Sequence, residues 1–174
     1  MARQLTTHAP LIVTVELAAR DQAWLDALRS RHFPPERNQL PAHLTMFHSL
    51  GPMLESELKH RLAALAAELP PPRAHLAGLM NLGGGVAFRI VSEDLDVIRS
   101  ELADAFRGSL TLQDQYGWRP HVTIQNKVTS SVAIATLAEL ARGFSPDPLG
   151  ISGLAYHHYE GGPWRLGKRY AFRG

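Results

Sequence analysis

The sequence predicts an α+β fold built from two pseudo-symmetric lobes of antiparallel sheet, with helices packed outside the lobes and a cleft between them. One observation is a repeat: the pattern His-apolar-Thr-apolar occurs at 43–46 and again at 121–124, 78 residues apart in a chain of 174. Another is that each half also carries two helical segments and a terminal pair of strands, and short turns between strands require antiparallel pairing. The length suits one hydrophobic core, so we expect residues 1–174 to form a single bilobal domain.

Each element of the first half has its own local signal. Short apolar runs predict strands, and apolar side chains at helical spacing, such as Trp24, Leu25 and Leu28, predict helices. Paired prolines and an asparagine mark a loop at 33–38, and three prolines at 70–72 end the second helix. Three consecutive glycines at 83–85 predict a hairpin turn. The expected elements are strand 11–17, helix 21–31, strand 42–50, helix 54–69 and strands 75–82 and 86–91.

The second half repeats this layout. Ser92 followed by two acidic residues predicts a helix start, because a serine side chain can cap the first turn and carboxylates favour the helix N-terminus. A turn-rich stretch at 114–120 leads into the second motif, and a glycine-rich turn at 160–163 separates the last two strands. The expected elements are helix 92–106, strand 121–127, helix 131–142 and strands 151–159 and 164–172.

Strand geometry places a histidine next to a threonine in both motifs. Side chains two residues apart on a strand point to the same face, about 6.5–7 Å from each other. His43 and Thr45 therefore project together, as do His121 and Thr123, while the apolar residues of each motif point to the other face. Each motif strand is thus expected to offer an imidazole and a hydroxyl group on its exposed face.

Composition excludes several classes of function. The chain has no cysteine, which rules out a disulfide framework, a thiolate metal site and a cysteine nucleophile. It has no apolar run long enough to span a membrane and no signal-peptide layout at its N-terminus, so we expect a cytoplasmic protein without a membrane partner. The net charge is +2 and no long basic stripe is present, which disfavours double-stranded DNA as a partner. No coiled-coil repeat or clear amphipathic surface indicates an oligomer, so a monomer is expected.

Two imidazoles that face each other across a cleft, each beside a hydroxyl group, suit the cleavage of a phosphodiester. One histidine can accept a proton from the attacking oxygen while the other donates a proton to the departing oxygen. The hydroxyl groups of Thr45 and Thr123 can donate hydrogen bonds to the non-bridging oxygens. We expect no metal and no other cofactor, because His43 and His48 face opposite sides of their strand and no carboxylates lie next to the motif histidines in the sequence.

The segments 42–48 and 119–124 resemble the 2H phosphoesterase superfamily, whose members include the RNA 2′,3′-cyclic phosphodiesterases, also called 2′-5′ RNA ligases. The resemblance implies metal-free opening of a 2′,3′-cyclic phosphate, or the reverse reaction with a 5′-hydroxyl. His43, Thr45, His121 and Thr123 would be the catalytic residues, and RNA ends or a small cyclic nucleotide the partners. Many RNA-processing members have Ala-Arg after the second motif, where this chain has 125–127 Gln-Asn-Lys, and an arginine and aromatic residues in their first strand, which strand 11–17 lacks.

Four further residues are candidates for binding the substrate. Strand parity places Phe47 on the face of His43, where its ring could stack on a base. It also places Gln125 and Lys127 on the face of His121, within reach of a phosphate. Arg119 precedes the second motif and is expected at the mouth of the cleft. The alternatives are a core position for Phe47, a solvated strand end for Lys127 and a surface role for Arg119.

The residues leave several alternatives open. A protein that binds a nucleotide or an RNA end without turning it over could use the same two histidines as phosphate ligands. The substrate could be a tRNA end, a small cyclic nucleotide, a cyclic ADP-ribose phosphate or a 2′-5′ oligonucleotide. For hydrolysis we favour His43 as the acid and His121 as the base, although a pseudo-symmetric pair permits both assignments. One of Tyr156, His157 and His158 could also border the cleft.

Overall fold

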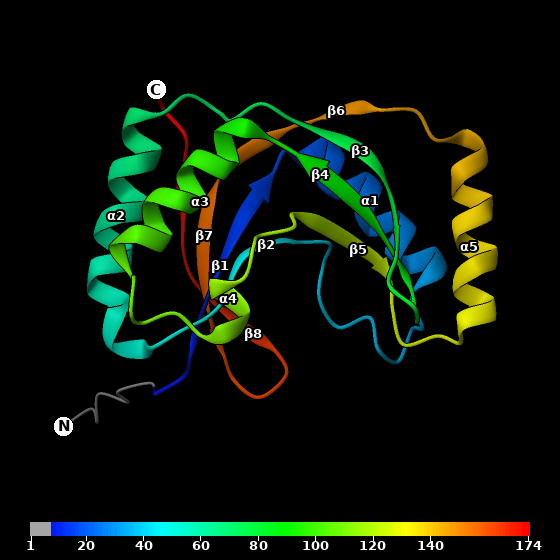
Figure 1. Ribbon diagram of the computed structural model, residues 1–174, viewed down its shortest axis with the longest axis horizontal. Helices are drawn as coiled ribbons and strands as arrows, with labels where there is room; N and C mark the ends of the chain where they lie inside the picture. Colours follow the sequence, from blue (N-terminus) through cyan, green and yellow to red (C-terminus); the bar gives the residue numbers. More distant parts are fainter. Residues whose placement is uncertain (1–7) are drawn as a thin grey trace.

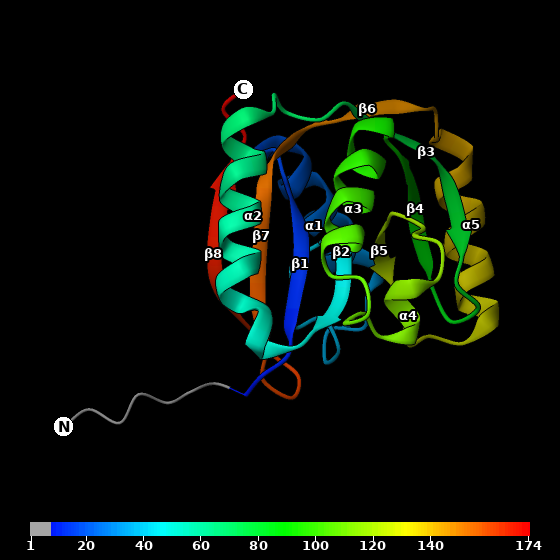
Figure 2. The ribbon, with the colours of Figure 1, turned by 60° about the vertical axis from the view of Figure 1, so that its left-hand side comes forward.

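A curled, eight-stranded antiparallel sheet with helices packed against it forms the fold in the computed structural model, which describes residues 8–174 (Figures 1 and 2). The strands are β1 (Leu11–Leu17), β2 (Leu44–Leu50), β3 (Ala74–Asn81), β4 (Val86–Val91), β5 (His121–Gln125), β6 (Asp147–Leu149), β7 (Ile151–Tyr159) and β8 (Trp164–Ala171). The helices are α1 (Ala19–His32), α2 (Glu55–Glu68), α3 (Glu93–Ala105), α4 (Leu112–Gln115) and α5 (Ser130–Gly143), with a 3-10 turn at Pro52–Leu54.

The order of the strands reflects the repeat in the sequence. It is β6-β3-β4-β5-β2-β1-β7-β8, with the two motif strands, β2 and β5, at the centre. Outward from this centre, β1 corresponds to β4, β7 to β3 and β8 to β6. The hairpins of the two halves exchange places: β3 and β4 follow the first motif, but β4 pairs with the second motif strand, β5, whereas β7 and β8 follow the second motif, but β7 pairs with β1. The predicted α+β class with two pseudo-symmetric halves of antiparallel sheet is confirmed.

The two halves meet where β2 runs antiparallel to β5. One pair of residues, Leu44 and Val122, forms this ladder in the described part of the chain. Both residues hold the second position of their motif, so equivalent positions lie opposite each other at the centre of the sheet. Figure 1 shows the strands of the two halves diverging on either side of this junction.

Helices cover both halves. α2 packs against β7 and β8, α1 against β5, and α5 against β3 and β4. Figure 2 shows α2 in front of β7, α3 between α2 and α5, and α5 beyond β3 at the far end of the sheet. Ser92 caps α3 as the sequence predicts, since its Oγ accepts a hydrogen bond from the backbone N–H of Leu95. None of the described helices has the length and apolar character that crossing a bilayer requires.

Three short elements lie outside the sequence-based prediction: the 3-10 turn, α4 and β6. They are three or four residues long, too short to show a hydrophobic period. β6 contains Pro148, which is tolerated because β6 is an edge strand. Every other element ends within two residues of its predicted boundary.

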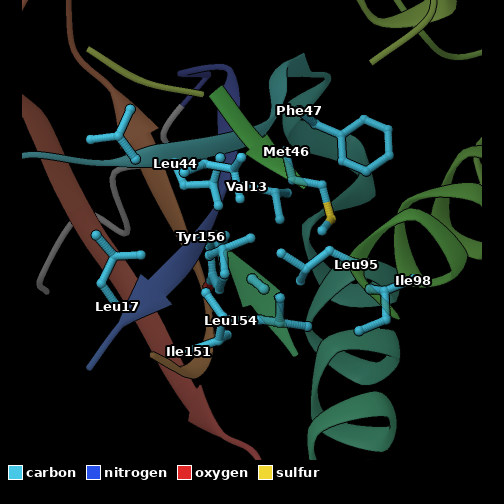
Figure 3. Close-up of a cluster of buried hydrophobic side chains, with 14 of the residues drawn as sticks. Val13, Leu17, Leu44, Met46, Phe47, Leu95, Ile98, Ile151, Leu154 and Tyr156 are labelled. Carbon is cyan, nitrogen blue, oxygen red and sulfur yellow. The ribbon is translucent and has the colours of Figure 1, made fainter. Parts of the chain in front are cut away.

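One part of the core lies between strands β1, β2 and β7 and the helices that cover them. Figure 3 shows side chains from β1, β2, β7 and α3 packed together, including Val13, Leu44, Met46, Leu154 and Leu95, all of which have no exposed surface. Leu44 therefore serves two purposes, since its backbone joins the two halves and its side chain anchors the first motif in the core.

Gly85 in the turn between β3 and β4 provides a test of how the second motif strand is held. A Cβ at this position would overlap the backbone carbonyl of Gln125, at the end of β5. We expect Gly85→Ala to lower the free energy of unfolding by about 1–3 kcal/mol, because the added methyl group must displace one strand. Gly117→Ala is the control: a Cβ there meets no atom, so its effect should stay within about 0.5 kcal/mol. Urea denaturation measures both, and equal stability of the two variants would contradict the packing described here.

Candidate active site

The two motif histidines are held in the same way. His43 Nδ1 lies 2.8 Å from the carbonyl oxygen of Pro41, and His121 Nδ1 lies 2.7 Å from the carbonyl oxygen of Arg119, in both cases two residues earlier in the chain. A carbonyl oxygen only accepts hydrogen bonds, so Nδ1 carries the hydrogen in both rings. Nε2 of each neutral imidazole is therefore left as an acceptor, and this is the atom that can take up or release a proton.

The register at the junction brings the four motif side chains together. Because β2 and β5 are antiparallel and Leu44 lies opposite Val122, His43 lies across from Thr123 and Thr45 across from His121. All four are half-buried, while Leu44 and Val122 are fully buried on the other face. The arrangement is two histidine–hydroxyl pairs side by side across the centre of the sheet.

Burial changes the protonation of one of these histidines. It lowers the pKa of His43 from its ordinary value to about 4. The hydrogen bond to the carbonyl of Pro41 acts in the opposite direction, and the charges of Arg29, His121 and His157 lower the pKa further. His43 is therefore neutral in the free protein near pH 7.

Two buried arginines support the motif strands from the helices. Arg29 of α1 donates from Nη1 to the carbonyl of Thr123 at 2.9 Å, and Arg99 of α3 donates from Nε to the carbonyl of Met46 at 3.0 Å. Each guanidinium also lies over a phenyl ring, Phe33 at 4.3 Å and Phe47 at 4.0 Å from the ring centroid. The repeat thus extends to a cationic support for each motif, which the sequence reasoning missed because neither arginine is near a motif in the chain.

Further hydrogen bonds fix the first motif strand. Asp26 of α1 accepts from the backbone N–H of Ala42 at 2.7 Å, and the indole N–H of Trp118 donates to the carbonyl of Thr45 at 3.0 Å. Asp114 accepts from the backbone N–H groups of His48 and Ser49, both at 3.0 Å. These partners come from three separate segments, so the position of β2 is determined by tertiary contacts on both of its ends.

The assignment of Phe47 and Gln125 to the motif face is wrong. Between Val13 and Thr14 of β1 the partner residue on β2 changes from Phe47 to Thr45, so β2 has one extra residue. β5 also has one extra residue at this motif position. Val86 of β4 pairs with Gln125 and the next residue, Ala87, pairs with Thr123, so Ile124 has no partner on β4. Such a bulge breaks the alternation of faces.

Both side chains are consequently buried. Phe47 has no exposed surface and lies in the core under Arg99, as its place in the cluster of Figure 3 shows. Gln125 is 2% exposed, and its amide donates to the hydroxyl of Thr136 at 2.8 Å. Phe47 cannot stack on a base and Gln125 cannot reach a phosphate in this arrangement; instead they hold the motif strands against α3 and α5.

The two other candidates lie at the surface. Lys127 is exposed and follows the end of β5, where its backbone adopts a left-handed conformation with φ of 63°. Arg119 is exposed, and its backbone carbonyl holds His121. Asn126, which follows β5, lines a hollow of about 250 Å³. The other lining residues are Arg29, His43, Thr123, Gly162 and four residues of the loop between α1 and β2, Phe33, Arg37, Gln39 and Leu40.

His43 also lines a larger pocket of about 670 Å³. Its walls come from β1, α1, the loop before β2, and the β7–β8 hairpin. The ring of Trp164 meets that of His43 edge-on, with centroids 4.7 Å apart, and lies 5.5 Å from that of His157. Nε2 of His157 is 2.9 Å from the hydroxyl of Thr14. Sequence reasoning missed Trp164, because only the strand order brings the last hairpin next to the first motif.

Of the three residues whose position the sequence left open, His157 borders this pocket. Tyr156 and His158 are buried and face α2, where Nε2 of His158 lies 3.1 Å from the carboxylate of Glu55. Alternation along β7 explains the difference, since His157 points to the opposite face from its two neighbours.

Comparison with known proteins shows which family the chain matches. The family model described as the 2′-5′ RNA ligase superfamily matches residues 17–163. No curated protein sequence matches the chain.

Solved structures share the fold at low identity. TT0787 of Thermus thermophilus superposes with a TM-score of 0.65 at 17% identity, over 95% of this chain and 98% of its own. Escherichia coli LigT complexed with 3′-AMP gives 0.60 at 18% identity, over 95% and 99% of the two chains. A protein described as a phosphoesterase gives 0.58 at 19% identity, with the same coverage.

The two half-buried histidines that line the pocket, His43 and His157, lead to a prediction about stability. Burial lowers the pKa of both His157 and His43 to about 4 in the folded protein, whereas the pKa of a histidine in the unfolded chain is about 6.5. Between these values the unfolded chain binds protons that the folded protein does not, so the free energy of unfolding should fall as the pH drops from about 6.5 toward about 4. His157→Gln should make this fall shallower in urea denaturation series at several pH values. An unchanged slope in the variant would contradict the burial described for His157.

Proposed function

Because the chain belongs to the 2′-5′ RNA ligase superfamily, we propose that it is a phosphoesterase that acts on 2′,3′-cyclic phosphate or 2′-5′ linked RNA ends or nucleotides. The paired histidines, His43 and His121, act as general acid and base, and no metal takes part. The observation that carries the proposal is the equivalent support of both rings, whose Nδ1 atoms are occupied by backbone carbonyls and whose Nε2 atoms remain available.

The reaction follows from this arrangement. One neutral Nε2 accepts a proton from a water molecule while its oxygen attacks the phosphorus of the cyclic phosphate. The bond from phosphorus to one ribose oxygen breaks, and that oxygen takes a proton from Nε2 of the other histidine. The hydroxyl groups of Thr45 and Thr123 donate hydrogen bonds to the non-bridging oxygens, where charge increases during the transfer. The product is a phosphate monoester. When a 5′-hydroxyl takes the place of water, the same displacement gives a phosphodiester, and each histidine keeps its role.

The protonation of His43 favours one assignment in the free protein. Its pKa, which burial lowers to about 4, keeps it neutral at pH 7, as a general base must be. We therefore assign His43 as the base and His121 as the acid for hydrolysis, the reverse of the assignment favoured on the sequence. The desolvated surroundings of His43 are the physical reason, and they are visible only once the chain is folded.

The shared fold supports a nucleotide as the substrate. LigT has been solved with 3′-AMP, a nucleoside that carries a phosphate monoester on its ribose. A monoester at this position is one of the two products that opening a 2′,3′-cyclic phosphate could give. A second candidate function is the binding of a nucleotide or RNA end without turnover. Arg29, which lines the hollow next to His43, would favour a bound phosphate in either case.

The proposed chemistry can be tested with an oligonucleotide that ends in a 2′,3′-cyclic phosphate. We expect conversion to a monoester in the presence of EDTA. His43→Ala or His121→Ala should reduce kcat by about 10²–10⁴-fold, because each removes a positioned acid or base. His75→Ala, at an exposed position on β3, is the matched control and should retain activity. Binding without turnover would favour the second candidate function, and activity only with added metal would overturn the two-histidine mechanism.

The assignment of the base predicts a particular pH dependence. Since burial lowers the pKa of His43 to about 4, the protein should keep its kcat/KM as the pH falls through about 6 and lose it only as the pH approaches about 4. The alkaline limb should report loss of the proton from the acid. Initial rates between about pH 4 and pH 9 on a cyclic nucleotide measure the profile. An acid limb centred at about 6.5 or above would contradict His43 as the base.

A further inference from the structure

We infer that the pocket beside His43 is a nucleobase site, in which Trp164 stacks on the base and Glu16 accepts a hydrogen bond from an exocyclic amino group. This inference rests on the proposed function, because it takes the reacting phosphate to lie at the motif histidines. It names the substrate class more closely: a cyclic phosphate attached to an amino-bearing nucleoside.

The first argument is the shape and surface of the pocket. Its volume of about 670 Å³ is in the range of small-molecule sites. Trp164 is half-buried and Leu166 is 39% exposed, so two large apolar side chains line the pocket and each keeps some accessible surface there. Aromatic side chains next to a phosphate site are typical platforms for bases, because every base has a π-face.

The second argument is the distribution of charge around His43. The pocket contains two carboxylates, Glu16 and Asp26, and one cation, Arg169, which is already paired with Glu16 at 3.0 Å. The smaller hollow that His43 also lines contains Arg29 and Arg37 and no carboxylate. A phosphate is therefore favoured away from the pocket, and the pocket favours a neutral group whose edge donates hydrogen bonds. Adenine, cytosine and guanine carry such amino groups and uracil does not.

The third argument is that the pocket breaks the symmetry of the repeat. Thr14 pairs with Thr45 on β2, and its hydroxyl contacts His157 on the pocket wall. The equivalent residue of the second half is Ala87, which pairs with Thr123 and has no polar group. Two equivalent histidines thus face unequal surroundings, as a substrate with a nucleoside on one side of its phosphorus requires.

The test compares substrates that differ only in the part placed in the pocket. Steady-state kinetics would be measured on 2′,3′-cyclic CMP, 2′,3′-cyclic UMP and glycerol 1,2-cyclic phosphate, which has no base. Trp164→Ala should raise KM for 2′,3′-cyclic CMP by about ten-fold more than KM for the base-free compound, the size of one lost base–aromatic stack beyond any effect on His43. Trp164→Phe should restore most of the loss. Trp24→Ala, on α1 outside the pocket, is the control and should behave like the wild type.

Glu16 is tested by the choice between two bases of the same size. The wild type should prefer 2′,3′-cyclic CMP to 2′,3′-cyclic UMP by about ten-fold in kcat/KM, because one presents an amino group where the other presents a carbonyl. Glu16→Gln should abolish this preference, since an amide can donate as well as accept.

Each outcome decides between the two levels of the proposal. Equal losses on the base-free compound and on the nucleotides would show that Trp164 acts on His43, and would overturn the base platform. Equal use of the two pyrimidines would overturn the role of Glu16. Turnover of none of the three compounds would count against the proposed function. Calorimetric titration of the wild type and of Trp164→Ala with 3′-CMP and 3′-UMP would then still test the base site. Equal affinities of the two proteins for both nucleotides would overturn it.

Discussion

The antiparallel contact between β2 and β5 is the constraint on which the site depends. One backbone pair, Leu44 with Val122, joins two four-stranded halves, and it joins them at the same position of the repeated motif. A register shifted by one residue would leave each motif histidine beside an apolar residue of the opposite strand, because such a shift exchanges the faces of a strand. The pairing of His43 with Thr123 and of Thr45 with His121 is a direct result of this register.

A bulge in each motif strand complements the junction. The last residue of each motif and the residue that follows it are both buried, so each strand leaves the cleft and enters the core immediately after its threonine. The cleft is thereby confined to a short stretch of strand, and the residues that follow hold the helices. Arg29 and Arg99 add a buried cation behind each strand. Each donates hydrogen bonds to buried backbone carbonyls, which would otherwise lack a partner.

The repeat is nearly symmetric in its backbone and unequal in its surroundings. His43 lies beside a large pocket and close to buried positive charge, which lowers its pKa, whereas the equivalent wall of the second half has a methyl group in place of a hydroxyl. The repeated backbone provides two equivalent groups that can transfer protons. Unequal walls then give those groups different tasks, since protonation depends on desolvation and on nearby charge.

Local patterns in the chain were sufficient for the α+β class, for almost every helix and strand, and for His43, Thr45, His121 and Thr123 as the central candidates. These predictions used the hydrophobic period, the positions of proline and glycine, and the doubled motif. All three are properties of residues close together in the chain, so they do not depend on tertiary contacts. The bulges that bury Phe47 and Gln125 depend on how β2 and β5 pair with β1 and β4, which no local pattern records. Trp164 reaches His43 only through the strand order, and the lowered pKa of His43 exists only where the folded chain removes water from its ring. The candidate groups could be found in the sequence, whereas their partners and protonation required contacts between residues far apart in the chain.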